Sequence, residues 1–332
     1  MPEITYNGRA YPLAPGESVL ACLMRHGAAI PSSCQAGACQ SCLMRAIEGK
    51  PPEKAQVGLK ESLRRQGYFL ACIARPETDL AIALPDEAAL QVPAVVADRA
   101  MLSADVLRLR LRAEAPLACA GGQFVSIVRP DGLIRPYSVA SLPDVDGYLE
   151  LHVRRTPNGQ MSNWLFDEVR VGDRVQIRGP GGDCFYLTES PQPPLLLAGT
   201  GTGLAPLVAI LRDALRHGHR APILLVHGAL NLDGFYLVEM LQDLAAVHEN
   251  VTYLRCMPDG LPGEGLEIGA FEEIVLRRVT NPADWRMYLC GHPDLVFGLR
   301  RRLFLAGASL KRIHSDAFLS APQAPATVKS NE

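Results

Sequence analysis

A cluster of three cysteines, Cys34, Cys39 and Cys42, constrains this chain more than any other feature of its sequence. Their spacing is C-x4-C-x2-C, and a fourth cysteine, Cys72, follows after a gap of twenty-nine residues. Four thiolates in this arrangement are typical of the plant-type [2Fe–2S] site. The small residues at 36–38 would let the backbone wrap closely around such a cluster, with amide groups pointing at its sulfurs. The pattern therefore predicts a [2Fe–2S] cluster.

Two other interpretations of the four cysteines stay open at this point. A structural zinc site is the main rival, although zinc sites usually combine two separated C-x2-C or C-x2-H pairs. Four buried structural cysteines are the other alternative. The sequence offers no comparable neighbours for four further cysteines, which we expect to be free and buried: Cys22, Cys119, Cys184 and Cys256.

The length and composition indicate a globular protein of two or three domains. The chain has 332 residues, of which 48% are hydrophobic and 20% charged, and its net charge of -2 excludes a basic nucleic-acid surface. No signal region is visible at the N-terminus, and nine cysteines make an odd number, which argues against a disulfide framework. We therefore expect a cytoplasmic metal-binding protein.

One uncharged run at 194–211 is long enough to be considered as a membrane span. Three glycines, two threonines and Pro206 interrupt it, so it is better interpreted as a strand, a loop and a helix. We expect no membrane insertion.

The first region, residues 1–90, has the pattern of a small mixed α+β domain. Asn7-Gly8 between two short apolar runs predicts a hairpin, and the spacing of apolar residues at 17–27 predicts a helix that ends near Gly27. Strand patterns follow at 42–49 and 78–85. The segment 85–94 has the composition of a linker.

The next two regions differ in their patterns. Residues 93–190 alternate apolar and charged side chains in short runs separated by Gly and Pro, which predicts an antiparallel β-barrel with one short helix near 161–169. Residues 194–320 alternate buried strand runs with helical stretches, which predicts a parallel-sheet α/β domain. The final residues, 321–332, have the composition of a disordered tail.

Two motifs in the barrel region predict a phosphate-binding surface. The stretch RPYSVAS places a fixed cation at Arg135, an aromatic ring at Tyr137 and a hydroxyl at Ser138. Further on, Gly159 ends a loop and Gln160, Met161 and Ser162 begin a helix, whose free amides can hold a pyrophosphate. The first motif alone is equally compatible with a salt bridge and a core tyrosine.

Two further motifs follow strands of the parallel sheet. A buried strand at 195–200 leads into Gly201, Thr202 and Gly203 and then a helix, and a second strand leads into Cys290-Gly291 and a helix that starts at Pro293. Both turns lie at carboxyl ends of parallel strands, where open α/β sheets bind their ligands. They are therefore candidates for a nucleotide site.

These motifs, in the order RxYS, GxxS, GTGxAP and CGxP, make residues 93–318 similar to the ferredoxin–NADP reductase superfamily. The first 85 residues resemble a plant-type ferredoxin. The chain as a whole thus resembles the bacterial reductases that supply oxygenases with electrons. The resemblance implies a multidomain fold: a β-grasp ferredoxin domain at 1–90, an FAD-binding barrel at 93–190 and an NAD-binding α/β domain at 194–320.

The resemblance also implies residue roles. Arg135 and Ser162 would contact the flavin diphosphate, Tyr137 would stack on the flavin and Ser138 would lie near its N5. Thr202 and Cys290 would surround the nicotinamide, which makes Ser138 and Cys290 the expected catalytic residues. Phe318 is the candidate for an aromatic shield over the flavin, although a core phenylalanine is an alternative. Many relatives have an aromatic residue where Cys184 stands, so no role is assigned to that segment.

The implied activity is electron transfer from NADH through FAD and the cluster to an oxygenase of Rieske or di-iron type, by a chain expected to be a monomer in isolation. A reductase for a sugar-deoxygenating enzyme remains an alternative, and so does a non-catalytic zinc module. Hydride transfer needs no acid–base residue, and His152, His227 and His292 offer no carboxylate partner by spacing. The stretch 227–236 lacks Arg and Lys, which favours NADH over NADPH. Asp233, its only charge, would repel a 2′-phosphate unless it merely caps the next helix.

Overall fold

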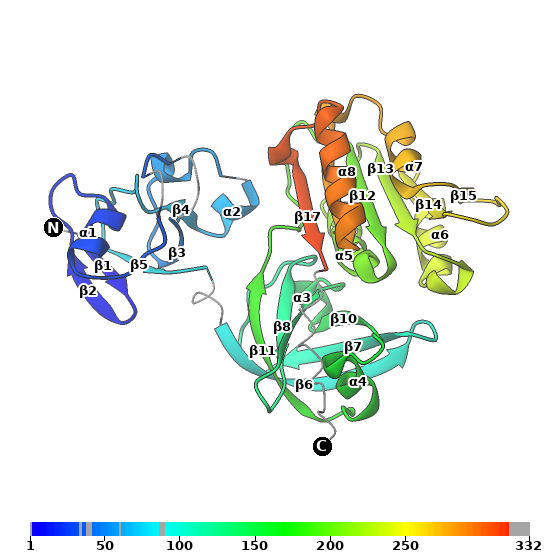
Figure 1. Cartoon of the computed structure of the whole chain (residues 1–332), viewed down its shortest axis with the longest axis horizontal. Coiled ribbons are helices and arrows are strands. Elements are labelled where there is room, and N and C mark those ends of the chain that lie inside the picture. The colour runs from blue at the N-terminus through cyan, green and yellow to red at the C-terminus, as the bar shows by residue number, and fades with distance from the viewer. Residues whose placement is uncertain (1, 33–34, 38–41, 60, 86–89, 319–332) are drawn as a thin grey trace, which may run out of the picture.

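The chain folds into three units, each built on its own β-sheet (Figure 1). The computed structural model describes residues 2–32, 35–37, 42–59, 61–85 and 90–318. Two of the predicted cluster ligands, Cys34 and Cys39, lie outside the described residues, as does the tail predicted at 321–332. None of the helices within the described ranges has the length and apolar content needed to cross a lipid bilayer.

The N-terminal unit is a five-stranded mixed sheet in the order β2-β1-β5-β3-β4, in which β1 and β5 are parallel. The predicted hairpin is confirmed, with Asn7 and Gly8 both at positive φ. The helix predicted at 17–27 is α1, whose Ser18 side chain caps it by accepting from the Ala21 amide. The elements are β1 (Glu3–Tyr6), β2 (Arg9–Pro12), α1 (Val19–Arg25), β3 (Leu43–Glu48), η1 (Glu53–Gln56), α2 (Glu61–Arg65), β4 (Tyr68–Leu70) and β5 (Leu80–Ala83).

The second unit is an antiparallel six-stranded sheet in the order β10-β7-β6-β11-β8-β9. Its two outer strands approach each other through one bridge, between Val139 and Leu151, so the sheet curls without a closed ladder. The predicted barrel is therefore confirmed only as a curled antiparallel sheet. The elements are β6 (Leu90–Met101), β7 (Val106–Ala113), β8 (Phe124–Val128), β9 (Ile134–Ser138), α3 (Pro143–Asp146), β10 (Leu149–Arg154), α4 (Gln160–Asp167) and β11 (Arg174–Gly181).

The segment interpreted as a linker is shorter than its composition indicates. Strand β6 begins at Leu90, and residues up to Pro93 already pair with β11. Pro93 has no amide to donate, yet its carbonyl accepts a hydrogen bond from the Glu114 amide. A segment with a proline near the start of a strand has the composition of a linker, because the sequence does not show which strands pair with it.

The third unit is a parallel six-stranded sheet in the order β15-β14-β13-β12-β16-β17, as predicted. Its strands are β12 (Leu195–Thr200), β13 (Ile223–Gly228), β14 (Val251–Met257), β15 (Leu266–Ile268), β16 (Arg286–Gly291) and β17 (Ile313–Ala317). Its helices are η2 (Gly201–Gly203), α5 (Leu204–Arg216), η3 (Leu232–Gly234), α6 (Val238–Val247), α7 (Phe271–Arg278), η4 (Pro282–Asp284), α8 (Pro293–Leu305) and η5 (Leu310–Arg312).

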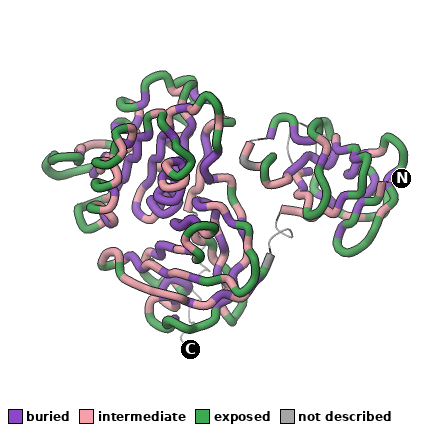
Figure 2. The backbone as a smooth tube through the Cα atoms, turned by 180° about the vertical axis from the view of Figure 1, so that it is seen from behind, coloured by how far each residue is buried: buried purple, intermediate pink, exposed green. Residues whose placement is uncertain are grey.

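Successive strand residues of the third unit bury opposite faces of its sheet. Leu195 and Leu197 pack with α5 and α6, whereas Leu196 and Ala198 pack with α7 and α8. Helices on both faces explain why β12, β13 and β16 are almost entirely buried rather than alternating in polarity. Figure 2 shows this buried interior, surrounded by exposed turns. The arrangement places the carboxyl ends of β12, β13 and β16 at one edge of the sheet, facing the second unit (Figure 1).

Candidate active site

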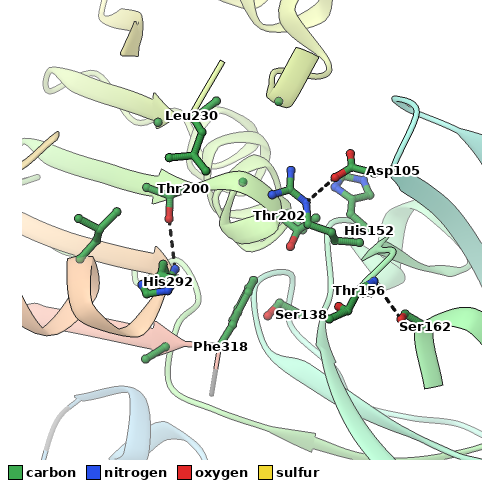
Figure 3. A pocket seen from close by; sticks show the side chains of 18 of the residues that line it. Asp105, Ser138, His152, Thr156, Ser162, Thr200, Thr202, Leu230, His292 and Phe318 are labelled. Atoms are coloured by element: carbon green, nitrogen blue, oxygen red, sulfur yellow. Dashed lines mark hydrogen bonds and ion pairs between the residues drawn. The ribbon is translucent and has the colours of Figure 1, made fainter. Parts of the chain in front are cut away.

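A cavity of about 1760 Å³ lies between the second and third units. Its walls come from β9, the start of α4, the loop after β12, the segment after β13 and the residue that follows β17 by one position, Phe318. Figure 3 shows Phe318 between Ser138 on one side and Thr200 with His292 on the other. The predicted flavin residues and the predicted nucleotide loop thus share one cavity.

Strand β9 contributes Arg135, Tyr137 and Ser138 to the cavity wall. Arg135 donates one hydrogen bond to the carbonyl of Ile134 at 2.7 Å, which holds the guanidinium beside its own strand. Tyr137 is half-buried, and burial raises the pKa of its phenol above the ordinary value, so the ring stays neutral. The strand therefore presents a cation and a neutral aromatic ring to one ligand.

The start of α4 forms the second wall of the cavity. Gln160, Met161 and Ser162 line it, and their amides belong to the first turn, which has no intrahelical acceptors. The Ser162 hydroxyl accepts from the Thr156 amide at 3.1 Å and donates to the Gly159 carbonyl at 3.2 Å, so it closes the preceding loop. This geometry suits an anionic group at the helix start.

The loop after β12 contributes Gly201 and Thr202 to the cavity, while Gly203 is buried behind it. A Cβ on Gly203 would lie 2.3 Å from the carbonyl oxygen of Cys290. The sequence predicts that this glycine admits a ligand; instead, its missing side chain lets the loop pack against β16. Gly291 has a similar role, since a Cβ there would lie 2.6 Å from the carbonyl oxygen of Thr200.

Cys290 is 1% exposed and is not among the residues that line the cavity. Burial raises the pKa of its thiol, so the group is held protonated. The Cys184 thiol is a neighbour, and hydrogen bonding with Cys290 together with burial holds its pKa well above the ordinary value. The predicted catalytic cysteine thus lies behind the cavity wall as a neutral thiol.

Asp316 is a site residue that the sequence analysis missed. It lies on β17, lines the cavity and accepts a 2.6 Å hydrogen bond from the Ser138 hydroxyl. Burial raises the pKa of this carboxyl, the Ser138 hydrogen bond opposes that shift, and Asp183 adds to it. Its position two residues before Phe318 was the one indication in the sequence that Asp316 belongs to the site. A single acidic residue near the end of the strand pattern forms no periodic pattern, so the sequence analysis did not identify it.

Another missed pair is Arg154 and Asp105, which line the cavity near the glycine loop and lie 3.2 Å apart. A Cβ on Gly201 would be 2.9 Å from Nη1 of Arg154. Asp233 lines the cavity as predicted, and it is not a helix N-cap: Asn231 caps η3, and Leu237 occupies that position before α6.

The expectation that the three histidines lack carboxylate partners is wrong for His292, whose Nδ1 lies 4.0 Å from the Asp294 carboxylate, and for His152. Its Nε2 lies 3.2 Å from the Glu150 carboxylate and its Nδ1 lies 3.1 Å from the Tyr236 hydroxyl. Residues 150 and 152 point to the same face of β10, as residues two apart on a strand do. The spacing alone did not show whether that face is buried, where the two side chains would pair, or exposed to solvent. His227 packs against aromatic rings, and burial lowers its pKa to about 3, so it is neutral.

Two of the four predicted cluster cysteines, Cys42 and Cys72, are described, and they lie together. The Ala71 amide donates to the Cys42 carbonyl at 3.0 Å, and both thiols are buried. Gly37, at φ +78°, packs so closely that a Cβ would lie 2.9 Å from a methyl group of Ile73. The loop at 35–37 therefore lies against the Cys72 segment, as a shared set of thiolate ligands requires.

Three parts of the chain match known domain families. Residues 4–77 match a 2Fe-2S iron-sulfur cluster binding domain. Residues 93–186 match an oxidoreductase FAD-binding domain, and residues 197–300 match an oxidoreductase NAD-binding domain.

The similarity extends over almost the whole length of several known proteins. The chain is 33% identical to the ferredoxin–NAD(P)+ reductase component of the naphthalene 1,2-dioxygenase system of Pseudomonas putida, over 94% of this chain and 96% of that protein. It is 33% identical to the reductase subunit of an aromatic O-demethylase from an Amycolatopsis species, over 96% and 98%. The crystal structure of the Amycolatopsis cytochrome P450 reductase GcoB superposes with a TM-score of 0.67 at 32% identity, over 97% and 100% of the two chains.

Proposed function

The chain belongs to the reductases that join a [2Fe–2S] domain to FAD-binding and NAD-binding domains, and we propose that it passes electrons from NADH through both cofactors to an oxygenase. It is an oxidoreductase with three cofactors: a [2Fe–2S] cluster, FAD and NADH. The observation that carries the proposal is the single cavity in which β9 and α4 face the loop after β12 across Phe318.

We assign the units to domains on the basis of their sheets. The N-terminal sheet, with β1 and β5 parallel at its centre and α1 packed on it, supports a β-grasp ferredoxin domain at 1–90. The curled antiparallel sheet supports an FAD-binding barrel at 93–190, and the parallel sheet an NAD-binding domain at 194–320.

One end of the cavity fits the flavin diphosphate. Arg135 supplies a fixed positive charge, and Gln160, Met161 and Ser162 supply first-turn amides. A guanidinium and a helix start both favour phosphate oxygens, so their convergence supports one anionic group between them.

The middle of the cavity fits a ring system. Tyr137 and Phe318 supply aromatic surface, Ser138 supplies a hydroxyl, and Gly201 with Thr202 supplies a backbone that another ring can approach closely. Gly203, Cys290 and Gly291 support that backbone from behind, so we propose that Cys290 positions the nicotinamide site through its thiol and carbonyl rather than through acid–base chemistry.

FAD, when bound, accepts two electrons as a hydride and releases them singly, which matches NADH to a one-electron cluster. The chain's own residues set the conditions for this exchange. Phe318 lines the cavity between Ser138 and Thr200, where its ring would shield a bound flavin from water. Ser138 and Asp316 hold a proton between Oγ and a carboxylate whose pKa burial raises. Arg135 balances phosphate charge.

An oxygenase component is the proposed acceptor because the naphthalene 1,2-dioxygenase relative is, by name, the reductase component of such a system. This evidence favours an oxygenase over the sugar-deoxygenating enzyme considered above. We also infer a cytoplasmic location, because the cysteines among the described residues are free, and we keep the monomer as an expectation.

Anaerobic titration with NADH tests the proposed function. The purified chain should show flavin and iron–sulfur absorption, and NADH should bleach both. A chain that holds zinc instead of iron, or whose iron–sulfur bands stay unchanged after flavin bleaching, would contradict it.

A further inference from the structure

The N-terminal unit touches the rest of the chain through hydrogen bonds at the end of α2. Gln66 Nε2 donates to the Gly182 carbonyl at 3.1 Å, and Gln123 Nε2 donates to Gln66 Oε1 at 2.9 Å and to the same carbonyl at 3.2 Å. Arg65 Nη2 donates to the Thr188 carbonyl at 3.0 Å. We call these five residues the docking contact. It joins positions that are 57 to 123 residues apart in the chain.

On the reductase side, the docking contact lies against the back of the cavity wall. Gln123 is 4% exposed, its Oε1 accepts from the Ala120 amide at 2.9 Å, and its carbonyl accepts from the Val139 amide at 2.7 Å. The next residue, Phe124, lines the cavity and pairs with Ser138 across β8 and β9. Gln123 is thus fixed directly behind the proposed flavin site.

On the ferredoxin side, the contact lies on the segment that leads to a predicted cluster ligand. The Gln66 carbonyl accepts from Arg45 Nε at 3.1 Å, and Gln56 Nε2 donates to the Tyr68 carbonyl at 2.8 Å. Strand β4 starts at Tyr68 and runs to Leu70, two residues before Cys72. Gln66 therefore lies at the start of a rigid path to the cluster site.

We propose that Gln66 is a positioning residue whose amide, held by Gln123 and Gly182, docks the ferredoxin unit for electron transfer from flavin to cluster. This inference rests on the proposed function. It adds the contact that positions the two units for electron transfer from flavin to cluster. Interfaces between domains of one chain are mobile unless large and apolar, so a few directed hydrogen bonds determine how often the units are docked. Removing the Gln66 amide also leaves the buried Gln123 amide with a partner missing.

Stopped-flow reduction by NADH of the holoprotein, under anaerobic conditions, tests the proposal in variants Gln66→Ala and Arg65→Ala. Flavin bleaching reports hydride transfer, and iron–sulfur bleaching reports the step from flavin to cluster. In Gln66→Ala we expect cluster bleaching to slow by about fivefold to a hundredfold, the effect of losing its two hydrogen bonds to Gly182 and Gln123, while flavin bleaching keeps its rate. Arg65→Ala should slow the same step less, because Arg65 is exposed.

Arg64→Ala is the matched control, since Arg64 is the preceding residue and its side chain pairs with Glu61 of the same helix. It should leave both steps unchanged. An unchanged cluster step in Gln66→Ala overturns the proposal, and so does an equal slowing in Arg64→Ala or an equal slowing of both steps. Failure of the proposed function would look different, because the cluster of the unaltered protein would then not be reduced at all.

Discussion

Ser138 and Asp316 lie 178 positions apart in the sequence, yet the Ser138 hydroxyl donates to the Asp316 carboxylate at 2.6 Å. The bond joins the last residue of β9 to β17 and so links the second and third units inside the cavity. Because burial raises the pKa of Asp316, the pair can hold a proton where a reduced ring would need to gain or lose one.

Asp316→Asn should change how stability depends on pH. The folded protein binds this proton more tightly than the unfolded chain, so folded protein loses stability as pH rises from 3.8, the ordinary value, through the raised pKa. The variant has no carboxyl at this position and so lacks that loss. As pH rises through this window, its Tm should therefore fall less than the Tm of the unaltered protein. Thermal unfolding of both proteins across pH measures the difference; parallel curves would show that the carboxyl ionises as freely as in the unfolded chain.

Arg135→Ala should weaken flavin binding at least tenfold, because a charge-assisted contact with phosphate contributes roughly 1.5–3 kcal/mol. Equilibrium dialysis or fluorescence titration with FAD measures the affinity. Arg174→Ala is the control, since Arg174, the first residue of β11, is exposed and pairs with Glu114. Arg135 is not a flavin ligand if the purified variant retains tightly held FAD in full stoichiometry.

Cys39→Ser should abolish reduction of a one-electron protein acceptor and leave NADH-dependent ferricyanide reduction largely intact. The reason is that removing one thiolate ligand disrupts the cluster but spares the flavin site. Cys22→Ser is the matched control in the same unit, since Cys22 is buried and its thiol bonds to the Pro12 carbonyl. Equal loss of both activities in Cys39→Ser would contradict a two-step relay.

NADH should be preferred over NADPH by a factor that could exceed about a hundred, because Asp233 would place a like charge beside a 2′-phosphate. Steady-state kcat/KM for both nucleotides measures the preference. Asp233→Arg should reduce it, whereas Asp243→Arg, on α6, should not. An equal or higher kcat/KM for NADPH in the unaltered protein would indicate that a cation such as Arg154 reaches the phosphate.

Gly203→Ala should destabilise the protein by roughly 1–3 kcal/mol, because its Cβ would meet the Cys290 carbonyl at 2.3 Å and force the loop off β16. NADH should also bind more weakly, since the loop carries Thr202. Gly263→Ala is the control, as a Cβ there meets nothing within 4 Å. Urea unfolding and KM for NADH measure both effects; equal behaviour of the two variants would show that the loop tolerates the shift.

Local patterns in the sequence determined most of the architecture. The Asn7-Gly8 turn, the alternation in β7 and the strand–helix alternation after residue 194 each depend on neighbours within a few residues, so each was predictable. The cavity-lining residues of β9, α4 and the loop after β12 were predicted for the same reason: each motif carries its own turn or helix start. The resemblance of those motifs to the ferredoxin–NADP reductase superfamily also implied the order of the FAD and NADH sites along the chain.

Only the tertiary structure decided which distant residues meet. Asp316 reaches Ser138 and Gln66 reaches Gln123 because three separate sheets pack in one arrangement, and Arg154 reaches Asp105 because β10 pairs with β7. No periodicity marks such pairs, since each partner satisfies its own local pattern equally well without the other. Gly203 is a further example. Its sequence context indicates a loop that contacts a ligand, but in the folded chain Gly203 packs against the Cys290 carbonyl. Contacts of this kind follow from strand order and packing distance, which depend on the whole fold rather than on any one segment.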